Sequence, residues 1–293
     1  MRVTMSMIYG SVVSRIQTTQ ASYAKAAEVA LTTKRINRPS DDPVGSSRAI
    51  DLRSMLASLD QYDSNLDTAA GFTEQTELAL ANVEEAIQRA KEIAVDINGG
   101  TSSAGDYAAA AEELDAIIDE VINNMNAKYG DRYVFSGYRT TTVPFDATGN
   151  YSGGPVGQDI EIEATQGQYL TINLTGDEVF KTGVDVPQVL IDMRDAIAAG
   201  DQAAITDQLS DLTAALDQVL SFETAMGAVT DRIDIARENN EQLRLSATAI
   251  LSDVEDADIT EAATEFTKQE TALEAVMTVS ARILQQNFLD FLA

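Results

Sequence analysis

The sequence contains no cysteine, no histidine and no tryptophan, and only five prolines and 6% aromatic residues among its 293 positions. Without cysteine the chain forms no disulfide and has no thiol nucleophile or thiolate metal ligand. Without histidine it lacks the commonest general base and the commonest metal-binding side chain. These absences exclude many kinds of enzyme active site. We therefore expect no catalytic residue, no cofactor and no bound metal.

Basic residues are also scarce, because 20 Lys and Arg stand against 47 Asp and Glu and leave a formal net charge of −27. Such a surface repels nucleic acid and anionic membranes, so we expect neither as a partner. Met1 to Gly10 contains no apolar run of signal-peptide length, and no stretch approaches the length of a transmembrane helix. We expect a soluble protein that, if exported, uses no cleaved signal peptide.

The two ends of the chain carry its longest amphipathic patterns. Between Asp253 and Ala293, a stretch without Gly or Pro, apolar residues recur at steps of three, four and seven, and a comparable stripe runs from Met5 to Lys34. Each predicts a helix too long for a compact core to cover, so we expect the two to pair with each other and with neighbouring copies. The predicted assembly interface comprises Ile8, Val12, Tyr23, Phe266, Leu273, Val276, Ile283, Phe288 and Phe291.

Two inner stretches carry heptad repeats, each with a second line of residues three positions further along. This pattern predicts the seam of a coiled coil, although packing within a helical bundle of one chain is an equal alternative. The lines are Leu59, Leu66, Thr73, Leu80, Ile87, Ala94 with Tyr62, Ala69, Thr76, Val83, Ala90, Ile97, and Ile205, Leu212, Val219, Met226, Ile233 with Phe222, Val229, Ala236, Leu243, Ile250.

Helix boundaries are marked by local signals. Asp42 followed by Pro43 predicts a helix start, and Asn98-Gly99-Gly100 predicts its end. The acidic run from Asp253 to Asp258 predicts the start of the terminal helix, because carboxylates favour helix N-termini, and it lacks the glycine and spaced oxygens of a calcium loop. The first helix should end near Asn37, which precedes Arg38-Pro39. A further helix is expected from Asp106 to Lys128.

The pattern changes to period two in the middle of the sequence. Ile160 and Ile162 alternate with glutamates, and after a turn at Gly167 a second alternating run begins at Leu170. We expect a small antiparallel β insert from Arg139 to Asp185, then a helix that ends at Gly200. A glycan-cleaving or peptidase activity in this insert is an alternative hypothesis, but a zinc site would need histidine.

The nested order predicts a mainly α protein: an elongated antiparallel helical bundle or coiled coil with paired N- and C-terminal helices and a small β insert, α+β overall. The expected domains are residues 1–40 with 253–293 as a terminal coiled-coil assembly domain, 41–138 with 186–252 as a helical rod domain, and 139–185 as a small β outer domain. Both chain ends would lie at one tip, which suits a filament subunit better than an enzyme.

Three stretches resemble the bacterial flagellin family, which includes hook-associated proteins. They are Leu31 to Val44 (LTTKRINRPSDDPV), Ile87 to Val95 (IQRAKEIAV), and Glu255-Asp256-Ala257-Asp258 followed by Thr264 to Leu273. One departure is Thr33, where many relatives have Gly before the Lys. The resemblance extends over everything outside the β insert and implies a structural protein rather than an enzyme.

Two further features are similar to hook-associated members rather than to flagellins. They are Gly130 to Tyr138 (GDRYVFSGY) with Pro144-Phe145 after it, and the ending Asn287 to Leu292 (NFLDFL). The resemblance implies export through the flagellar type III apparatus and assembly outside the cell at the junction of hook and filament. It also implies self-association, contacts with other hook-associated and flagellin subunits, and an export chaperone. A flagellin proper, the filament subunit, is the alternative, because both share the terminal regions.

Overall fold

The computed structural model describes residues 5–99, 103–155, 157 and 159–292. The chain divides into two compact units, residues 1–58 with 243–293 and residues 59–242, which we call the terminal unit and the central unit. The helices are α1 (Met5–Thr32), α2 (Pro43–Asn98), α3 (Ala104–Met125), α4 (Gly176–Phe180), α5 (Val186–Ala199), α6 (Gln202–Glu255) and α7 (Ile259–Leu292). The strands are β1 (Lys128–Tyr129), β2 (Arg132–Tyr133), β3 (Glu161–Thr165) and β4 (Gln168–Thr171). The expected mainly helical fold with paired terminal helices and a small β component is confirmed.

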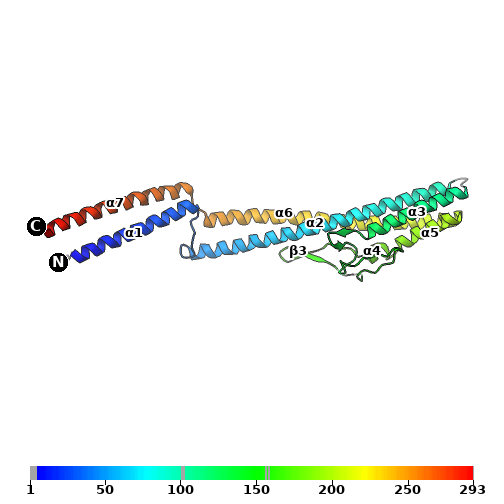
Figure 1. Ribbon diagram of the computed structural model, residues 1–293, viewed down its shortest axis with the longest axis horizontal. Helices are drawn as coiled ribbons and strands as arrows, with labels where there is room; N and C mark the ends of the chain where they lie inside the picture. Colours follow the sequence, from blue (N-terminus) through cyan, green and yellow to red (C-terminus); the bar gives the residue numbers. More distant parts are fainter. Residues whose placement is uncertain (1–4, 100–102, 156, 158, 293) are drawn as a thin grey trace. The chain divides into compact units, whose positions relative to one another are not determined.

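In the terminal unit, α1 and α7 lie side by side and run in opposite directions (Figure 1). Tyr23 contacts Phe266, and Val12, earlier on α1, lines a groove with Val276, later on α7. Buried and half-buried residues follow alternating steps of four and three, the spacing of a coiled-coil seam. We call this set the terminal seam: Val12, Ile16, Thr19, Tyr23, Ala26 and Ala30 on α1, and Ala262, Phe266, Gln269, Leu273, Val276, Ser280 and Ile283 on α7.

Two boundaries of the terminal helices differ from the sequence prediction. α1 ends at Thr32 rather than near Asn37, because Thr33 takes a left-handed conformation with φ of 57°. α6 continues to Glu255 and α7 begins at Ile259, so a start at Asp253 was wrong. The cap of α7 is Asp258, whose Oδ1 accepts hydrogen bonds from the backbone N–H of Thr260 and Glu261 at 2.7 and 3.2 Å.

Other boundaries follow the expected signals. α2 begins at Pro43, and the Asp42 carboxylate accepts a hydrogen bond from the Gly45 N–H at 2.9 Å. α2 ends at Asn98 and α5 ends before Gly200, which has φ of 66°. α3 begins two residues before the predicted Asp106 and ends three before the predicted Lys128; Ser103 and Asp106 cap each other at its start.

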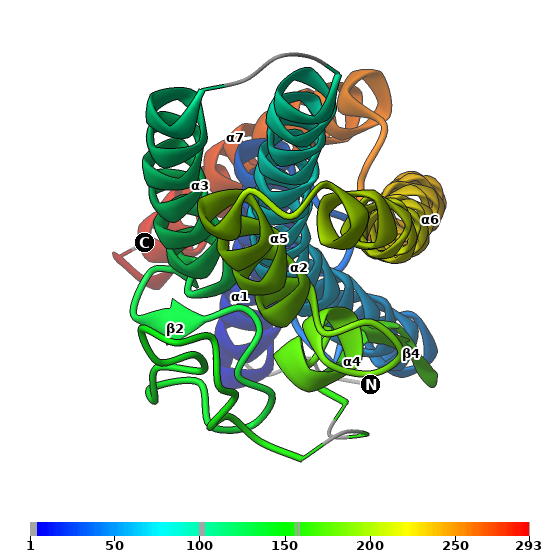
Figure 2. The same ribbon diagram turned by 90° about the vertical axis from the view of Figure 1, so that its right-hand side faces the viewer.

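In the central unit, α2, α3 and α5 lie side by side when viewed end-on (Figure 2). α6 runs antiparallel to α2, because Arg237 donates a hydrogen bond to Asp67 at 2.6 Å whereas Thr206, at the other end, contacts Asn98 at 3.1 Å. The first heptad line of each helix is buried along its whole predicted length.

The second heptad line of α6 departs from the prediction at its C-terminal end, inside the terminal unit. Leu243 and Ile250 are 42% and 48% exposed, whereas the next residues, Arg244 and Leu251, are half-buried. An α-helix has 3.6 residues per turn, so a strict seven-residue line rotates away from a partner unless the helices supercoil fully. In this part of α6 the buried face therefore lies one residue further along the sequence than the predicted heptad line.

Polar side chains interrupt the apolar packing of α2 against α6. Thr73 and Thr76 are fully buried, and the Thr230 hydroxyl donates a hydrogen bond to Glu77 Oε1 at 2.7 Å. One carboxylate oxygen of Glu223 is buried without a hydrogen-bond donor. Burial, together with the neighbouring Glu84, raises the pKa of Glu223 above its ordinary value. The negative charge of Glu223 is therefore less favourable here than it would be in water.

The β structure consists of two short antiparallel pairs. β1 pairs with β2, and β3 pairs with β4 so that Glu161 lies opposite Thr171. The second pair confirms the expected alternation, whereas the first pair precedes the predicted insert. The predicted division into three domains stays a prediction.

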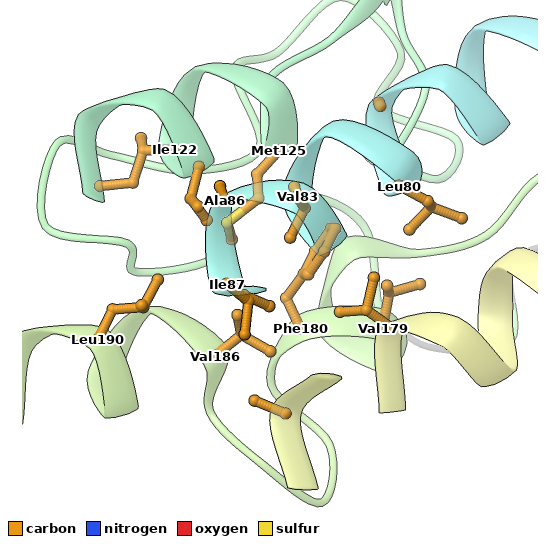
Figure 3. Close-up of a cluster of buried hydrophobic side chains, with 14 of the residues drawn as sticks. Leu80, Val83, Ala86, Ile87, Ile122, Met125, Val179, Phe180, Val186 and Leu190 are labelled. Carbon is orange, nitrogen blue, oxygen red and sulfur yellow. The ribbon is translucent and has the colours of Figure 1, made fainter. Parts of the chain in front are cut away.

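The segment between α3 and α5, which contains the four strands and α4, shares its core with the long helices of the central unit. Figure 3 shows Phe180 and Val179 of α4 directed toward Leu80 and Val83 of α2. The Phe180 ring lies 5.1 Å from Phe135. Ile122 and Met125 of α3 and Leu190 of α5 belong to the same cluster. The segment that follows Arg139 thus contributes aromatic side chains to the principal core.

Candidate assembly site

The terminal seam is thinly covered because a pair of helices buries each side chain on one side only. Tyr23 and Phe266 form its largest contact, with ring centroids 5.4 Å apart. The register set by this contact places Ala26 opposite Ala262, and Thr19 opposite Gln269. Small and polar residues at seam positions bury little apolar area, so the pair gains less stability than one with Leu at every position.

The structure brings most of the predicted assembly residues together. Val12 is buried, and the other described members are half-buried, all within the terminal seam where they face the partner helix of the same chain. Those others are Tyr23, Phe266, Leu273, Val276 and Ile283. Ile8, Phe288 and Phe291 lie outside the residues whose side chains the structure describes. Contact of these residues with other copies stays a prediction.

Sequence reasoning missed most of the apolar residues on the outward faces of the terminal helices, and it counted one of them, Met277, in the stripe that faces the partner helix. Met7 and Val13 of α1 are 64% and 49% exposed, and Met277 and Val279 of α7 are 51% and 54% exposed. A search for one stripe per helix selects the residues that face the partner helix, and it leaves out a second apolar group beside that stripe. Their exposed side chains offer apolar surface for contact with another chain, and this contact stays a prediction.

A second feature, which we call the terminal junction, ties residues 33–36 to residues 254–257. The Arg35 N–H donates to the Glu255 carbonyl at 2.7 Å, and the Ala257 N–H donates to the Thr33 carbonyl at 2.9 Å. Lys34 and Asp256 form an antiparallel bridge. The two connections between terminal and inner helices are therefore joined to each other by backbone hydrogen bonds.

The side chain of Glu255 holds the centre of the terminal junction. The residue is 4% exposed, and its carboxylate accepts hydrogen bonds from Lys34 Nζ and Arg53 Nη2, each at 2.6 Å. A buried carboxylate is tolerated because two cations and their hydrogen bonds compensate its lost hydration. The sequence prediction assigned this acidic run to a helix start, and only Asp258 has that role. Backbone donors from Glu261 and Thr260 lower the pKa of Asp258.

The charge of the chain is divided unequally between its units. The terminal unit holds 11 basic and 13 acidic residues, a net charge of −2, whereas the central unit holds 9 basic and 34 acidic residues, a net charge of −25. The part that carries the terminal seam and terminal junction is therefore almost neutral. Nearly all of the net negative charge of the chain belongs to the central unit.

The described part of the chain offers little for other kinds of site. Within it, no group of three or more acidic side chains is placed to hold a metal ion. None of its helices combines the length and the apolar character needed to cross a bilayer.

The chain is similar to known proteins in sequence and in fold. Residues 3–140 match the bacterial flagellin N-terminal helical region, and residues 209–292 match the bacterial flagellin C-terminal helical region. Flagellar hook-associated protein 3 of Salmonella typhimurium is 30% identical over 301 residues, 94% of each chain. Flagellin of Bacillus subtilis is 24% identical over 98% of this chain and 97% of its own. The flagellar junction protein FlgL of Legionella pneumophila has the same fold, with a TM-score of 0.60 at 15% identity over 71% of this chain and 99% of its own.

Two of the three stretches that resemble flagellins, Leu31 to Val44 and Glu255 to Asp258, meet at the terminal junction, and the matched regions together span most of the sequence. With a 30% identical relative aligned along nearly the full length of both chains, this protein belongs to the bacterial flagellin family.

Proposed function

We propose that the chain is a structural subunit of the bacterial flagellum that polymerises through its terminal helices at the junction between hook and filament. The observation that carries this proposal is the alignment with hook-associated protein 3, at 30% identity over 94% of both chains, against 24% for the Bacillus flagellin. The Gly130 to Tyr138 motif and the aromatic ending support the same choice. The chain acts by contact and catalyses no reaction.

The α1–α7 pair is the element through which copies assemble. Its seam residues are mostly half-buried, and Met277 and Val279 are more than half exposed, so the isolated chain leaves apolar surface in water. Burying that surface against other subunits stabilises the assembled state by about 25 cal/mol per Å². The gain offsets the entropy lost when the helices become fully ordered. Assembly and ordering of the terminal helices are therefore coupled.

The site of action lies outside the cell, in the flagellum. The family resemblance supports export through the flagellar type III apparatus without a cleaved signal peptide, with help from an export chaperone. The partners are copies of this chain, other hook-associated proteins and flagellin subunits. Neither nucleic acid nor membrane is a partner, because the central unit carries a net charge of −25.

Immunogold electron microscopy of isolated flagella tests this proposal. We expect label confined to a short zone at the boundary of hook and filament. A strain without the gene should make hooks that carry no filament, and the wild-type gene should restore filaments. Label along the whole filament would identify a flagellin instead, and absence of label from flagella would contradict both readings.

A charge placed in the terminal seam tests the assembly element. Leu273→Asp should abolish filament attachment, whereas Thr271→Asp, on the exposed side of α7, should leave it intact. Each variant introduces one Asp into α7, and the two positions are only two residues apart. The variants therefore have the same net charge and nearly the same location in the helix. Equal attachment by both variants would show that the seam does not carry assembly.

A further inference from the structure

A cavity of about 430 Å³ lies in the terminal unit between α1 and the start of α7. Ala26, Val29, Ala257 and Ala262 form its apolar part, and their short side chains leave the space unfilled. We call this cavity the terminal socket. Its volume is within the range of pockets that accept a ligand or a protruding side chain.

Carboxylates outnumber cations around the terminal socket. Lys25 and Arg35 are the cations, and both already have acidic partners, Asp41 at 2.9 Å and Asp42 at 3.5 Å. The carboxylates that line the socket are Asp256, Asp258, Glu261 and Glu265. Within the described part of the chain, Glu261 is the member of this set for which no ion pair or hydrogen bond of the carboxylate is found. The socket thus offers an apolar interior beside an uncompensated negative charge.

The same unit carries a protruding surface with the opposite character. Val44, in the first turn of α2, is 73% exposed. Arg48 follows four residues later, on the same face of the helix, and is also exposed. No described residue forms an ion pair with Arg48. We call Val44 and Arg48 the α2 ridge.

We propose that the α2 ridge of one copy docks in the terminal socket of a second copy, with Val44 in the apolar part and Arg48 beside Glu261. The complementarity of charge selects this occupant, because among the described residues neither the Arg48 guanidinium nor the Glu261 carboxylate has an ion-pair partner within its own chain. Docking would also remove the exposed Val44 side chain from water. The inference rests on the proposed function, which requires copies of the chain to pack together.

The contact has a consequence for the kind of assembly. Ridge and socket are different patches of one unit, so a copy can use its ridge on one neighbour and its socket on another. Such heterologous contacts propagate into rings or helical arrays, whereas a self-complementary patch closes into a pair.

Disulfide crosslinking tests the contact directly, because the chain has no cysteine of its own. Full-length Val44→Cys and Ser22→Cys variants are purified separately, mixed at high concentration and oxidised. Ser22 lines the socket and is exposed, so the substitution is nearly isosteric and leaves Glu261 in place. A disulfide forms only when the two Cα atoms come within about 7 Å. Leu245→Cys, 63% exposed in the same unit, replaces Val44→Cys in the control mixture.

We expect a mixed dimer from Val44→Cys with Ser22→Cys in clear excess over the control mixture. Adding Arg48→Glu to the Val44→Cys copy should reduce the yield roughly fivefold, and Glu261→Arg in the other copy should restore it. Equal yields from the two mixtures, or a dimer that forms mainly from Val44→Cys alone, would overturn the inference. The immunogold experiment reports separately on the proposed function, since it locates the unmodified protein without reference to this contact.

Discussion

Replacing Glu255 by Gln keeps the size of the side chain and removes its charge from the centre of the terminal junction. Lys34 Nζ and Arg53 Nη2 now donate to a carboxylate that is almost fully buried. The Gln amide has a single acceptor oxygen, and its NH₂ group would face one of the two cations. We therefore expect one charge-assisted hydrogen bond to be weakened and the other to be lost.

The magnitude follows from the exposure of the partners. Breaking a fully buried ion pair by removing one member costs about 3–5 kcal/mol. The side chains of Lys34 and Arg53 are 43% and 51% exposed, so both cations regain water and the cost falls. We expect Glu255→Gln to destabilise the terminal junction by about 2 kcal/mol, which corresponds to roughly thirtyfold faster local opening.

Hydrogen exchange followed by mass spectrometry measures this opening. Exchange should accelerate at the Arg35 and Ala257 amides, whose acceptors lie across the terminal junction. Glu270→Gln is the matched control, because Glu270 is exposed on α7 and the same substitution there should change stability by less than about 0.5 kcal/mol. If both variants exchange at the same rate in residues 33–36 and 254–257, Glu255 does not hold the junction.

Three further substitutions should each change the free energy of unfolding in a defined direction. Thr33→Gly should raise the free energy of unfolding by about 1 kcal/mol, because a β-branched residue is strained at φ of 57°; a lower melting temperature would contradict this. Glu223→Gln should stabilise the chain at pH 7, because burial and neighbouring carboxylates raise the pKa of Glu223, so the wild type gains stability as pH falls through that raised pKa. The advantage of the variant should vanish below about pH 4.3, the ordinary glutamate pKa. Urea unfolding at both pH values measures it, and a difference that stays the same at the two pH values would contradict this reasoning. Gly149→Ala should lower the free energy of unfolding by about 2 kcal/mol, because φ is 76° and the new Cβ would lie 2.5 Å from Pro187 Cβ. The control Gly157→Ala, with φ of 82° and open space around the new Cβ, should cost about half as much. Equal melting temperatures for the two variants would refute the steric part of this argument.

Periodicity predicted the helices well because it depends only on residues close in sequence. The lines that begin at Leu59 and Ile205 are buried as expected. The prediction of burial was wrong at Leu243 and Ile250, the last two positions of the second heptad line of α6. Burial there depends on how far α6 and its partner helix supercoil around each other, which is a property of the helix pair rather than of one sequence. The end of α1 was predicted too late because Thr33 ends the helix in the left-handed conformation. That conformation is usually taken by Gly, so nothing in the sequence indicated it at this position.

The candidate site was predictable only in part. The stripes of α1 and α7 identified residues that need an apolar partner, but a stripe does not say whether the covering helix belongs to the same chain. Glu255 gave no local signal for its role, because Lys34 and Arg53 lie 221 and 202 positions away in the sequence. Long-range ion pairs of this kind require the fold before they can be recognised.

The unequal division of charge also governs how two copies meet. At physiological ionic strength the field of the central unit decays over about 8 Å, so it acts only when surfaces nearly touch. A copy that arrives with its central unit foremost meets 25 excess negative charges with 25 of its own, whereas one that presents its terminal unit meets almost none. Repulsion therefore opposes an encounter between two central units far more strongly than an encounter between two terminal units, which is the one that the proposed assembly uses.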